Sequence, residues 1–512
     1  MLKMDKRRAK YHGYIRAGTV LAVFFMQIIL IWNMVVYLQM HAANYYLALE
    51  MLSVLTVLLL LNDSEENQQT WLVILLVFPG FGFILYYLWG PPRRKSKLHK
   101  RIRQREAEMK ARLINDSNVE EEFAKIHPNK VQIARYLERD GFPMYKGTKM
   151  KYYPSGEAME PDFMKDLESA KESIFLEYFI VYDGDWWQRI FRILEAKVEE
   201  GVEVRLLVDD FGSLSINNRE LRKEIISKGI QICFFAPIDS RISSLSFNYR
   251  NHQKIAVIDS TIGYTGGINL ADEYINAIVR FDYWKDTAVR LEGAAVWSLT
   301  NTFLEMWEES VSGEEPEPER WKPKYHTEDD GYVQPFSGGP HRNPNNPVEG
   351  VYLRMINKAR DYVYITTPYL VLDNKMMDTL RQAAASGVDV KIMVPHVYDK
   401  WYVYMVNVSN YGRLIKSGVK VYEYMPGFIH AKNVISDDEC AVCGTVNLDC
   451  RSMHIHYENA VFFSENQAVG DMKEDFLDCL EQCEEISYEE WTKRPLWKKM
   501  IQSILRLHSP ML

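Results

Sequence analysis

The spacing of apolar residues changes along this chain, and each kind of spacing predicts a different element. Short apolar runs, such as those at 173–181, 202–208 and 255–258, are typical of buried strands. Between them apolar residues recur at helical spacing, as at 186–198. Strand and helix patterns alternate from residue 127 onward, which predicts an α/β fold with mixed sheets covered by helices.

The first 92 residues have a different pattern, in which apolar residues form long segments. Three such segments cover about 19–40, 45–61 and 71–89. The first and third are long enough to span a bilayer as helices, whereas the second is short and contains Glu50. We therefore expect transmembrane spans near 19–40 and 71–89, with 45–61 lying in the interface or re-entrant. Three true spans are the alternative.

Charge is distributed unevenly. Residues 1–113 hold 16 Lys and Arg against 7 Asp and Glu, whereas the remaining 399 residues hold 45 against 62. Basic clusters before the first apolar segment and after the last should both stay cytoplasmic, which requires an even number of crossings and cytoplasmic catalytic lobes. The basic end favours contact with anionic lipid head groups at the cell membrane. The acidic body argues against a nucleic-acid partner.

A polar motif precedes the apolar run at 255–258, where His252 and Lys254 stand two residues apart. Because alternate residues of a strand share a face, the imidazole and the ammonium should point into one pocket. Such a pair suits a phosphate, since the ammonium holds anionic oxygens while the imidazole attacks or protonates. A single His-x-Lys pair is common, however, and specifies little.

The same motif occurs a second time with identical spacing. Its two copies comprise His252, Lys254, Asp259 and Asn269, and His430, Lys432, Asp437 and Asn447. Two upstream blocks repeat in the same order, since 173–183 matches 363–373 and 201–208 matches 387–394. Three matching blocks indicate a duplicated module. Two His-x-Lys pairs supply both a nucleophile and a general acid, as phosphodiester exchange requires.

At these residues the chain resembles the phospholipase D superfamily, whose signature begins with His-x-Lys and occurs twice. With its membrane segments, it is similar to the bacterial cardiolipin synthases of that superfamily. The resemblance implies two phospholipase D-like lobes that bring both motifs to a shared cleft. It also implies a phosphatidyltransferase that joins two phosphatidylglycerols into cardiolipin and releases glycerol through a phosphohistidine intermediate. No cofactor is expected.

The resemblance also implies roles for individual residues. Catalytic roles fall to His252 as nucleophile, His430 as acid and base, and Lys254, Asp259, Lys432 and Asp437. The two lysines, with Asn269 and Asn447, would hold the phosphate oxygens. Asp286 and Glu458 would orient the two imidazoles. Asp259 and Asp437 lie five residues beyond their lysines, too far along a straight strand to reach the same pocket, so turn capping is the physical alternative.

These patterns divide the chain into six parts. They are membrane segments (1–92), a basic linker (93–126), a first lobe (127–311), an inter-lobe linker (312–346), a second lobe (347–490) and an amphipathic C-terminal helix (491–512). That helix has apolar residues largely on one side, which suits either a membrane interface or packing onto the body.

Several alternatives remain open from the sequence. A phospholipase D hydrolase or a phosphatidylserine-type synthase would carry the same motifs, and an inactive membrane scaffold is a less favoured third. Cys440 and Cys443 have the spacing of half a zinc site, although strand packing also explains them and structural zinc needs four convergent ligands. We expect no metal. The acceptor alcohol and the oligomeric state are not predicted.

Overall fold

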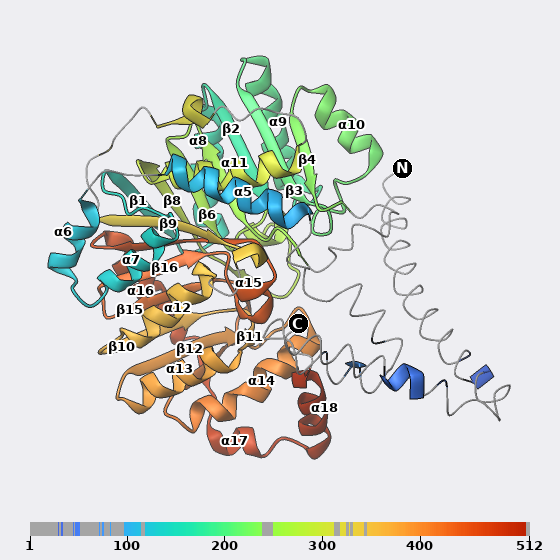
Figure 1. Cartoon of the computed structure of the whole chain (residues 1–512), viewed down its shortest axis with the longest axis vertical. Coiled ribbons are helices and arrows are strands. Elements are labelled where there is room, and N and C mark those ends of the chain that lie inside the picture. Colours follow the sequence, from blue (N-terminus) through green and yellow to red (C-terminus); the bar gives the residue numbers. More distant parts are fainter. Residues whose placement is uncertain are drawn as a thin grey trace. The chain divides into compact units, whose positions relative to one another are not determined.

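The structure is a computed structural model of the chain. It describes residues 97–113, 118–237, 249–311, 318–323, 327, 331–342 and 346–507, together with isolated positions between 29 and 82. The expected membrane segments 19–40, 45–61 and 71–89 fall almost wholly outside these residues. Within the described part of the chain, no helix is long and apolar enough to cross a bilayer. The ranges Arg94–Ser240 and Asn248–Leu512 form one compact unit, which contains both sheets (Figure 1).

The first sheet has seven strands in the order β1-β8-β6-β5-β2-β3-β4. Their bounds are β1 Thr148–Tyr153, β2 Ser173–Tyr178, β3 Glu203–Asp209, β4 Gln231–Phe235, β5 Lys254–Ile258, β6 Ile262–Gly266 and β8 Ala288–Gly293. Neighbours from β2 to β4 are parallel and the remaining pairs are antiparallel, so the sheet is mixed, as predicted. The helices of this lobe are α8 Gly156–Ser169, α9 Asp185–Glu199, α10 Arg219–Ser227 and α11 Val296–Ser310.

The second sheet repeats this arrangement, with eight strands in the order β19-β13-β12-β10-β15-β16-β18-β9. Their bounds are β9 Tyr332–Gly338, β10 Tyr362–Thr366, β12 Asp389–Pro395, β13 Lys420–Tyr424, β15 Asn433–Ser436, β16 Cys440–Gly444, β18 Glu458–Ser464 and β19 Cys483–Glu485. Its helices are α12 Pro347–Asn357, α13 Asn374–Ala385, α14 Trp401–Ile415 and α16 Gln467–Leu480. Seven strands match the first sheet in order and direction, which confirms the predicted duplication of α/β lobes.

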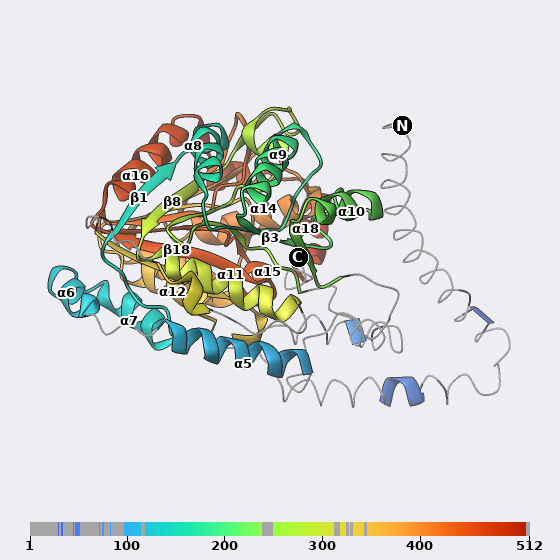
Figure 2. The ribbon, with the colours of Figure 1, turned by 90° about the horizontal axis from the view of Figure 1, so that it is seen from above.

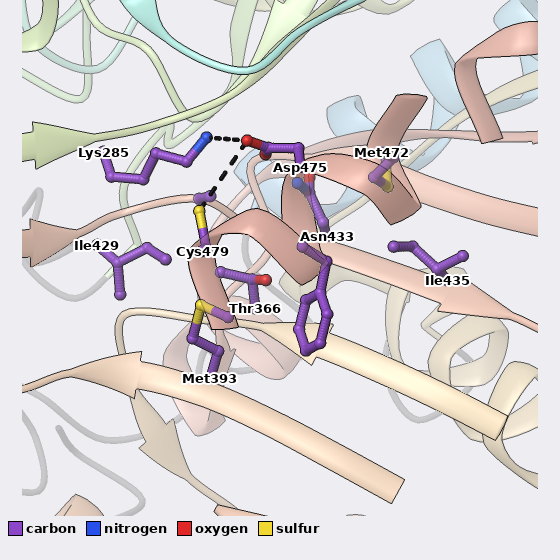
Figure 3. Close-up of a pocket in the computed structure, with 11 residues that line it drawn as sticks. Lys285, Thr366, Met393, Ile429, Asn433, Ile435, Met472, Asp475 and Cys479 are labelled. Carbon is purple, nitrogen blue, oxygen red and sulfur yellow. Dashed lines mark hydrogen bonds and ion pairs between the residues drawn. The ribbon is translucent and has the colours of Figure 1, made fainter. Parts of the chain in front are cut away.

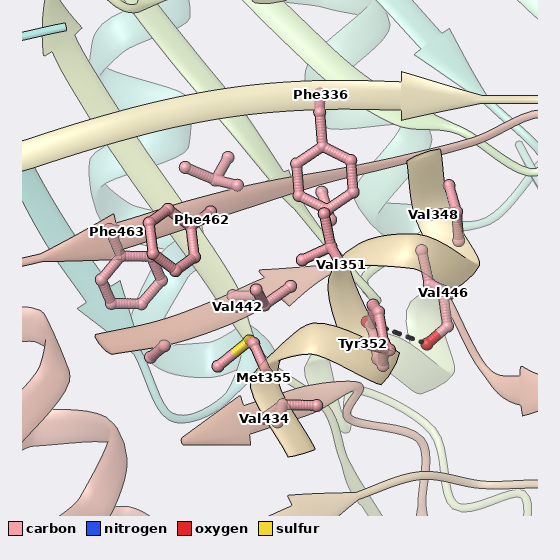
Figure 4. Close-up of a cluster of buried hydrophobic side chains, with 14 of the residues drawn as sticks. Phe336, Val348, Val351, Tyr352, Met355, Val434, Val442, Val446, Phe462 and Phe463 are labelled. Carbon is pink, nitrogen blue, oxygen red and sulfur yellow. Dashed lines mark hydrogen bonds between the residues drawn. The ribbon is translucent and has the colours of Figure 1, made fainter. Parts of the chain in front are cut away.

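The range 312–346 is more than the expected linker, because it contains β9. This strand corresponds to β1 of the first lobe and pairs with β18 at the edge of the sheet. Pro335 lies inside β9, and proline is tolerated there because an edge strand does not need every N–H. Phe336 packs with Val351 and Phe462 in the core (Figure 4). The Pro-rich composition around β9 concealed a strand of the second lobe.

The range 93–126 also differs from the expected exposed linker. It contains α5 (Lys97–Arg112) and α6 (Val119–Ile126), and α5 lies along α11 (Figure 2). Met109 and Leu113 are buried, and the Arg112 guanidinium pairs with Glu308 at 3.2 Å. Two apolar residues one turn apart are too few to form a visible stripe, yet they are enough to dock the end of α5 on the body.

Candidate active site

The two sequence motifs lie where β5 and β15 begin, and each is tied to the opposite lobe. The main-chain N–H of His252 donates to the carbonyl of Tyr457 at 2.9 Å, just before β18. The N–H of His430 donates to the carbonyl of Lys285 at 2.7 Å, where β14 (Gly427–Ile429) pairs with β7 (Tyr283–Lys285). Both histidine residues are buried, with 7% and 6% of their surface exposed. The lobes therefore meet at the two histidines.

Each imidazole is held by a carboxylate of the other lobe. His252 Nδ1 lies 3.0 Å from both carboxylate oxygens of Glu458, and His430 Nδ1 lies 2.6 Å from Oδ2 of Asp286. The structure thus brings the two expected acids to the two expected histidines, but across the lobe interface. Since a carboxylate on Nδ1 fixes the tautomer, Nε2 of each ring is left to react. Among the described residues, each motif histidine thus has its Nδ1 carboxylate in the opposite lobe.

The residues that support the two carboxylates differ between the lobes. The hydroxyl of Thr445 donates to Glu458. Gly267 occupies the matching position in the first lobe, and a Cβ there would lie 1.9 Å from Oδ1 of Asp286. Asp286 therefore reaches His430 only because residue 267 has no side chain, whereas the longer Glu458 leaves room for a hydroxyl that binds it.

The motif lysines lie inside the same pocket. Lys254 Nζ donates to the carbonyl of His252 at 2.8 Å, and Lys432 makes the same bond to the carbonyl of His430. Burial lowers the pKa of Lys254 to about 7 and that of Lys432 to about 8. Both ammonium groups therefore lose their protons far more readily than an exposed lysine does.

The histidines are shifted in the same direction. Burial, followed by the charge of Lys432, lowers the pKa of His430 to about 4. Burial, followed by Lys254 and Lys432, lowers the pKa of His252 well below its ordinary range. Because the lysine of one motif acts on the histidine of the other, the two motifs lie close enough to interact electrostatically. A phosphodiester anion that entered the site would raise the pKa values of both histidines and both lysines. Binding of the anion would therefore favour uptake of a proton by these groups.

Comparison with known proteins agrees with this geometry. Residues 163–307 and 352–480, in the two lobes, match the family described as cardiolipin synthase, PLD-like domain. The chain belongs to this family. Residues 51–91 match a second family, described as phospholipase D-nuclease N-terminal.

Individual relatives of the cardiolipin synthase family extend the match over most of the chain. A cardiolipin synthase of Halalkalibacterium halodurans is 35% identical over 89% of this chain and 91% of its own. An uncharacterized protein of Streptococcus mutans is 40% identical over 89% of this chain and 99% of its own. The crystal structure of a phosphatidylserine synthase of Haemophilus influenzae superposes with a TM-score of 0.58, covering 74% of this chain and 99% of that one, at 14% identity. That likeness shows the fold alone.

In this member of the cardiolipin synthase family the two histidines have unlike neighbours. The His456 ring lies 5.5 Å from that of His252, and Arg451 Nε donates to His456 Nε2 at 3.2 Å. Trp284 takes the matching place 5.4 Å from His430. His456 and Trp284 each stand two residues before the carboxylate of their lobe, so aligning the repeats beyond the asparagine would have found both. His252 therefore lies beside a second imidazole, whereas the matching neighbour of His430 is an indole ring.

The two motif asparagines are also used differently. Asn269 Oδ1 accepts the N–H of Ile180 at 3.0 Å, and its Nδ2 donates to the Tyr274 hydroxyl at 2.7 Å. This leaves at most one amide N–H for a phosphate, so the main task of Asn269 is to hold the chain after β2. The buried Oδ1 of Asn447 has no hydrogen-bond partner among the described residues.

Asp259 and Asp437 are not brought to the histidines. Asp259 accepts the N–H groups of Lys171, Glu172 and Ser173 at 2.7–2.9 Å, where β2 begins. Asp437 does the same at the start of β10 and pairs with Lys130 Nζ at 2.6 Å. Both aspartates follow the strand end farthest from the lysines and adopt a positive φ, +50° and +58°. These bonds fit the capping alternative, in which each aspartate anchors a neighbouring strand, and a catalytic role for either stays a prediction.

Two groups of described side chains hold three possible metal ligands close together. They are His252, His456 and Glu458, and Glu349, Asp373 and His454. The first belongs to the pocket just described, where Lys254 adds a positive charge that disfavours a cation. Neither group includes Cys440 or Cys443, which lie three residues apart in β16 and so point to opposite faces of the sheet. These two cysteines cannot act together as half of a zinc site.

A small cavity lies behind the second motif, lined by Lys285, Asn433 and Asp475 among others (Figure 3). Lys285 Nζ pairs with Asp475 of α16 at 2.6 Å, and the Tyr152 hydroxyl donates to the same carboxylate at 2.7 Å. Neither histidine lines this cavity. The Lys285–Asp475 pair joins β7 to the second lobe. Because β7 ends next to Asp286, the polar residues around this cavity help to position the site.

Proposed function

We propose that this protein is a membrane enzyme that transfers a phosphatidyl group from one phosphatidylglycerol to another, giving cardiolipin and glycerol. The observation that carries the proposal is the pair of buried histidines in one pocket, each oriented by a carboxylate of the opposite lobe and flanked by a lysine. Two imidazoles supply the nucleophile and the general acid of a double displacement. The cardiolipin synthase named among the relatives supports the choice of lipid substrate.

In the first step, Nε2 of His252 attacks the phosphorus of the donor lipid. An N–P bond forms and the P–O bond to the head-group glycerol breaks. His430 gives its proton to the departing glycerol oxygen, while Lys254 and Lys432 stabilise the charge on the non-bridging oxygens. Asp286 stabilises the imidazolium that serves as the acid, so the proton on Nε2 is available once the anion has entered.

In the second step, the head-group hydroxyl of another phosphatidylglycerol attacks the phosphohistidine. His430, now neutral, takes the hydroxyl proton, the N–P bond breaks and cardiolipin leaves. One phosphodiester replaces another, so neither ATP nor a redox partner enters the balance. The assignment of His252 as nucleophile rests on the family resemblance, because the two motifs are nearly symmetric.

The proposal includes the membrane arrangement expected from the sequence. The apolar segments near 19–40 and 71–89 would be the two spans, and the basic clusters beside them would keep the lobes cytoplasmic. The similarity of 51–91 to a phospholipase D-nuclease N-terminal family supports treating this end as part of the enzyme. Because the lipid substrate stays in the bilayer, an enzyme that acts on it benefits from a membrane anchor.

The test is to incubate the purified full-length protein with phosphatidylglycerol vesicles and to resolve the lipid products. We expect cardiolipin and glycerol in equal amounts, with little phosphatidic acid, and we expect excess glycerol to drive the reaction backwards. Phosphatidic acid as the main product, unaffected by glycerol, would replace the proposal with a hydrolase. Phosphatidylserine formed only when serine is added would replace it with a phosphatidylserine-type synthase.

A further inference from the structure

The C-terminal helix α18 (Leu496–Leu507) packs against α14 (Figure 1). Four large residues keep most of their surface exposed: Leu496 74%, Trp497 58%, Met500 59% and Ile504 57%. At about 100° per residue these four lie on one stripe. Gln502 lies on the opposite side and is only 3% exposed. The helix therefore packs on the body through the side that carries Gln502 and Leu505, and it leaves this apolar stripe exposed.

Specific polar contacts fix this orientation. Arg494 donates to the Gln502 side chain at 2.8 Å and to the carbonyl of Val408 in α14 at 3.0 Å. Trp491, in α17 (Tyr488–Thr492), donates to the same carbonyl at 2.6 Å. Rotating the helix to bury its apolar stripe would break the Gln502 bond. Because exposed apolar surface of this extent is unfavourable in water, the outward stripe indicates a binding surface.

The packed side of α18 is connected to the catalytic motifs by a short chain of contacts. Leu505 of α18 packs with Val371 and Val403. Val371, in β11 (Leu370–Val371), pairs with Asp449 of β17 (Leu448–Asp449), two residues after the motif Asn447. The charge of Lys400, which precedes α14, contributes to the lowered pKa of His252.

Exposed aromatic residues extend the apolar surface from α18 across the beginning of α14. Trp401 is 58% exposed and Tyr398 is 45% exposed. Both lie within two residues of Lys400, whose charge acts on His252. A partner that covered α18 and the beginning of α14 would therefore lie near residues that surround the histidines.

Charge indicates which partner this surface binds. The helix carries Lys498, Lys499 and Arg506 and no acidic residue, and Lys493 and Arg494 precede it. At about 100° per residue, Lys498 and Arg506 lie on either side of the buried Gln502, and both are exposed to solvent. A basic helix that exposes an apolar stripe with a tryptophan suits the interface of an anionic bilayer, where apolar side chains enter the acyl region and nearby cations meet phosphates. A second copy of this chain would bring an identical basic helix, whose like charges disfavour that pairing.

We propose that Leu496, Trp497, Met500 and Ile504, with Trp401, form a docking surface that inserts into an anionic phospholipid bilayer. Docked in this way, the body holds its catalytic opening against the membrane surface, where lipid head groups enter without leaving the bilayer. The inference rests on the proposed function for its choice of a phospholipid partner. It adds a second, interfacial contact to the anchor expected at residues 1–92.

The first test uses the full-length protein in phosphatidylglycerol vesicles, with a photoreactive benzoylphenylalanine in place of Ile504. The matched control carries it in place of Ile126, which is 52% exposed on α6, far from α18 (Figure 1). We expect lipid adducts at position 504 and few at 126. Equal labelling at both positions would overturn the proposal, and so would protein–protein adducts at 504, which would assign the stripe to a second copy.

The second test separates docking from chemistry. The double variant Trp497→Ser and Ile504→Ser should raise the KM for phosphatidylglycerol in vesicles roughly tenfold, while changing activity on monomeric short-chain phosphatidylglycerol less than about twofold. Ile126→Ser should change neither. Equal loss on both substrates would mean a structural role and would overturn the proposal. Lipid adducts at 504 without any cardiolipin formation would instead refute the proposed function and leave the docking surface standing.

Discussion

At the scale of single residues, the site depends on two buried carboxylates that their surroundings hold in fixed positions. Glu458 accepts bonds from His252 of the other lobe and from Thr445 of its own, and it is fully buried. Asp286 fits against the backbone only because residue 267 is glycine. In both lobes the carboxylate is thus fixed before substrate arrives, so it can orient the imidazole without further reorganisation.

This arrangement predicts the effect of Glu458→Gln, which keeps the shape of the side chain but removes its charge. The amide no longer stabilises an imidazolium at His252, so we expect kcat to fall by at least about a hundredfold with the thermal unfolding midpoint little changed. Cardiolipin formation from phosphatidylglycerol vesicles is the assay. The control is Glu465→Gln, which alters another Glu–His pair, 2.6 Å from His127, outside the pocket. A Glu458→Gln enzyme that kept a tenth of its turnover would contradict the assigned role.

At the scale of elements, the site is assembled by strands that cross from one lobe to the other. β7 of the first lobe pairs in parallel with β14 of the second, and the carbonyl of Lys285 binds the N–H of His430. The side chain of the same lysine pairs with Asp475 of α16, beneath the second motif. The position of Asp286 therefore depends on a helix about 190 residues away in the chain, and short-range sequence patterns contain no sign of that dependence.

Lys285→Met should accordingly weaken both the fold and the reaction. Removing one partner of a buried ion pair leaves Asp475 uncompensated, which costs about 3 kcal/mol. We expect a lower unfolding midpoint in detergent and a lower kcat, because β7 also positions Asp286. The control is Lys151→Met, which breaks an exposed 2.6 Å pair with Asp162 and should change stability by less than about 1 kcal/mol. Equal effects of the two variants would show that the Lys285–Asp475 pair has no special role.

At the scale of the whole molecule, α5 fixes the lobes to the basic segment that follows residue 92, so in the proposed membrane arrangement both would lie on one side. Its end is docked on α11 through Met109, Leu113 and the Arg112–Glu308 pair. Whatever side the basic segment after residue 92 occupies, the body must occupy it too. The topology is therefore testable with reporters placed where they do not disturb this contact.

A reporter fused after Leu512 should be cytoplasmic, and one inserted within 62–70 should be external. Basic clusters before the first span and after the second both stay cytoplasmic, so the segment between the two spans lies outside. Enzymatic activity of fused alkaline phosphatase and fluorescence of a fused green fluorescent protein measure the two locations. An external C-terminus together with a cytoplasmic 62–70 would establish three spans and place the lobes outside.

The sequence by itself determined the repeated α/β pattern, the two His-x-Lys motifs and the two carboxylates that follow them. These features are local, because strand periodicity and motif spacing depend on neighbouring residues. β9 was missed because Pro335 and a Pro-rich approach conceal an edge strand, whose pairing depends on β18 from the far end of the lobe. For Asp259 and Asp437 the sequence left a catalytic role and turn capping open, and only the folded chain shows which N–H groups their carboxylates bind.

Only the tertiary structure decided which lobe supplies each carboxylate and which side of α18 faces outward. Spacing along the chain places Asp286 much nearer to His252 than to His430, so the exchange between lobes becomes visible only when the duplicated sheets are packed together. The α18 pattern fits packing on the body as well as exposure, and the buried Gln502 with its Arg494 bond settles the orientation. In both cases the contacts that decide the arrangement join residues of different elements. The periodicity of one helix or strand cannot predict them, because they form only when folded elements pack together.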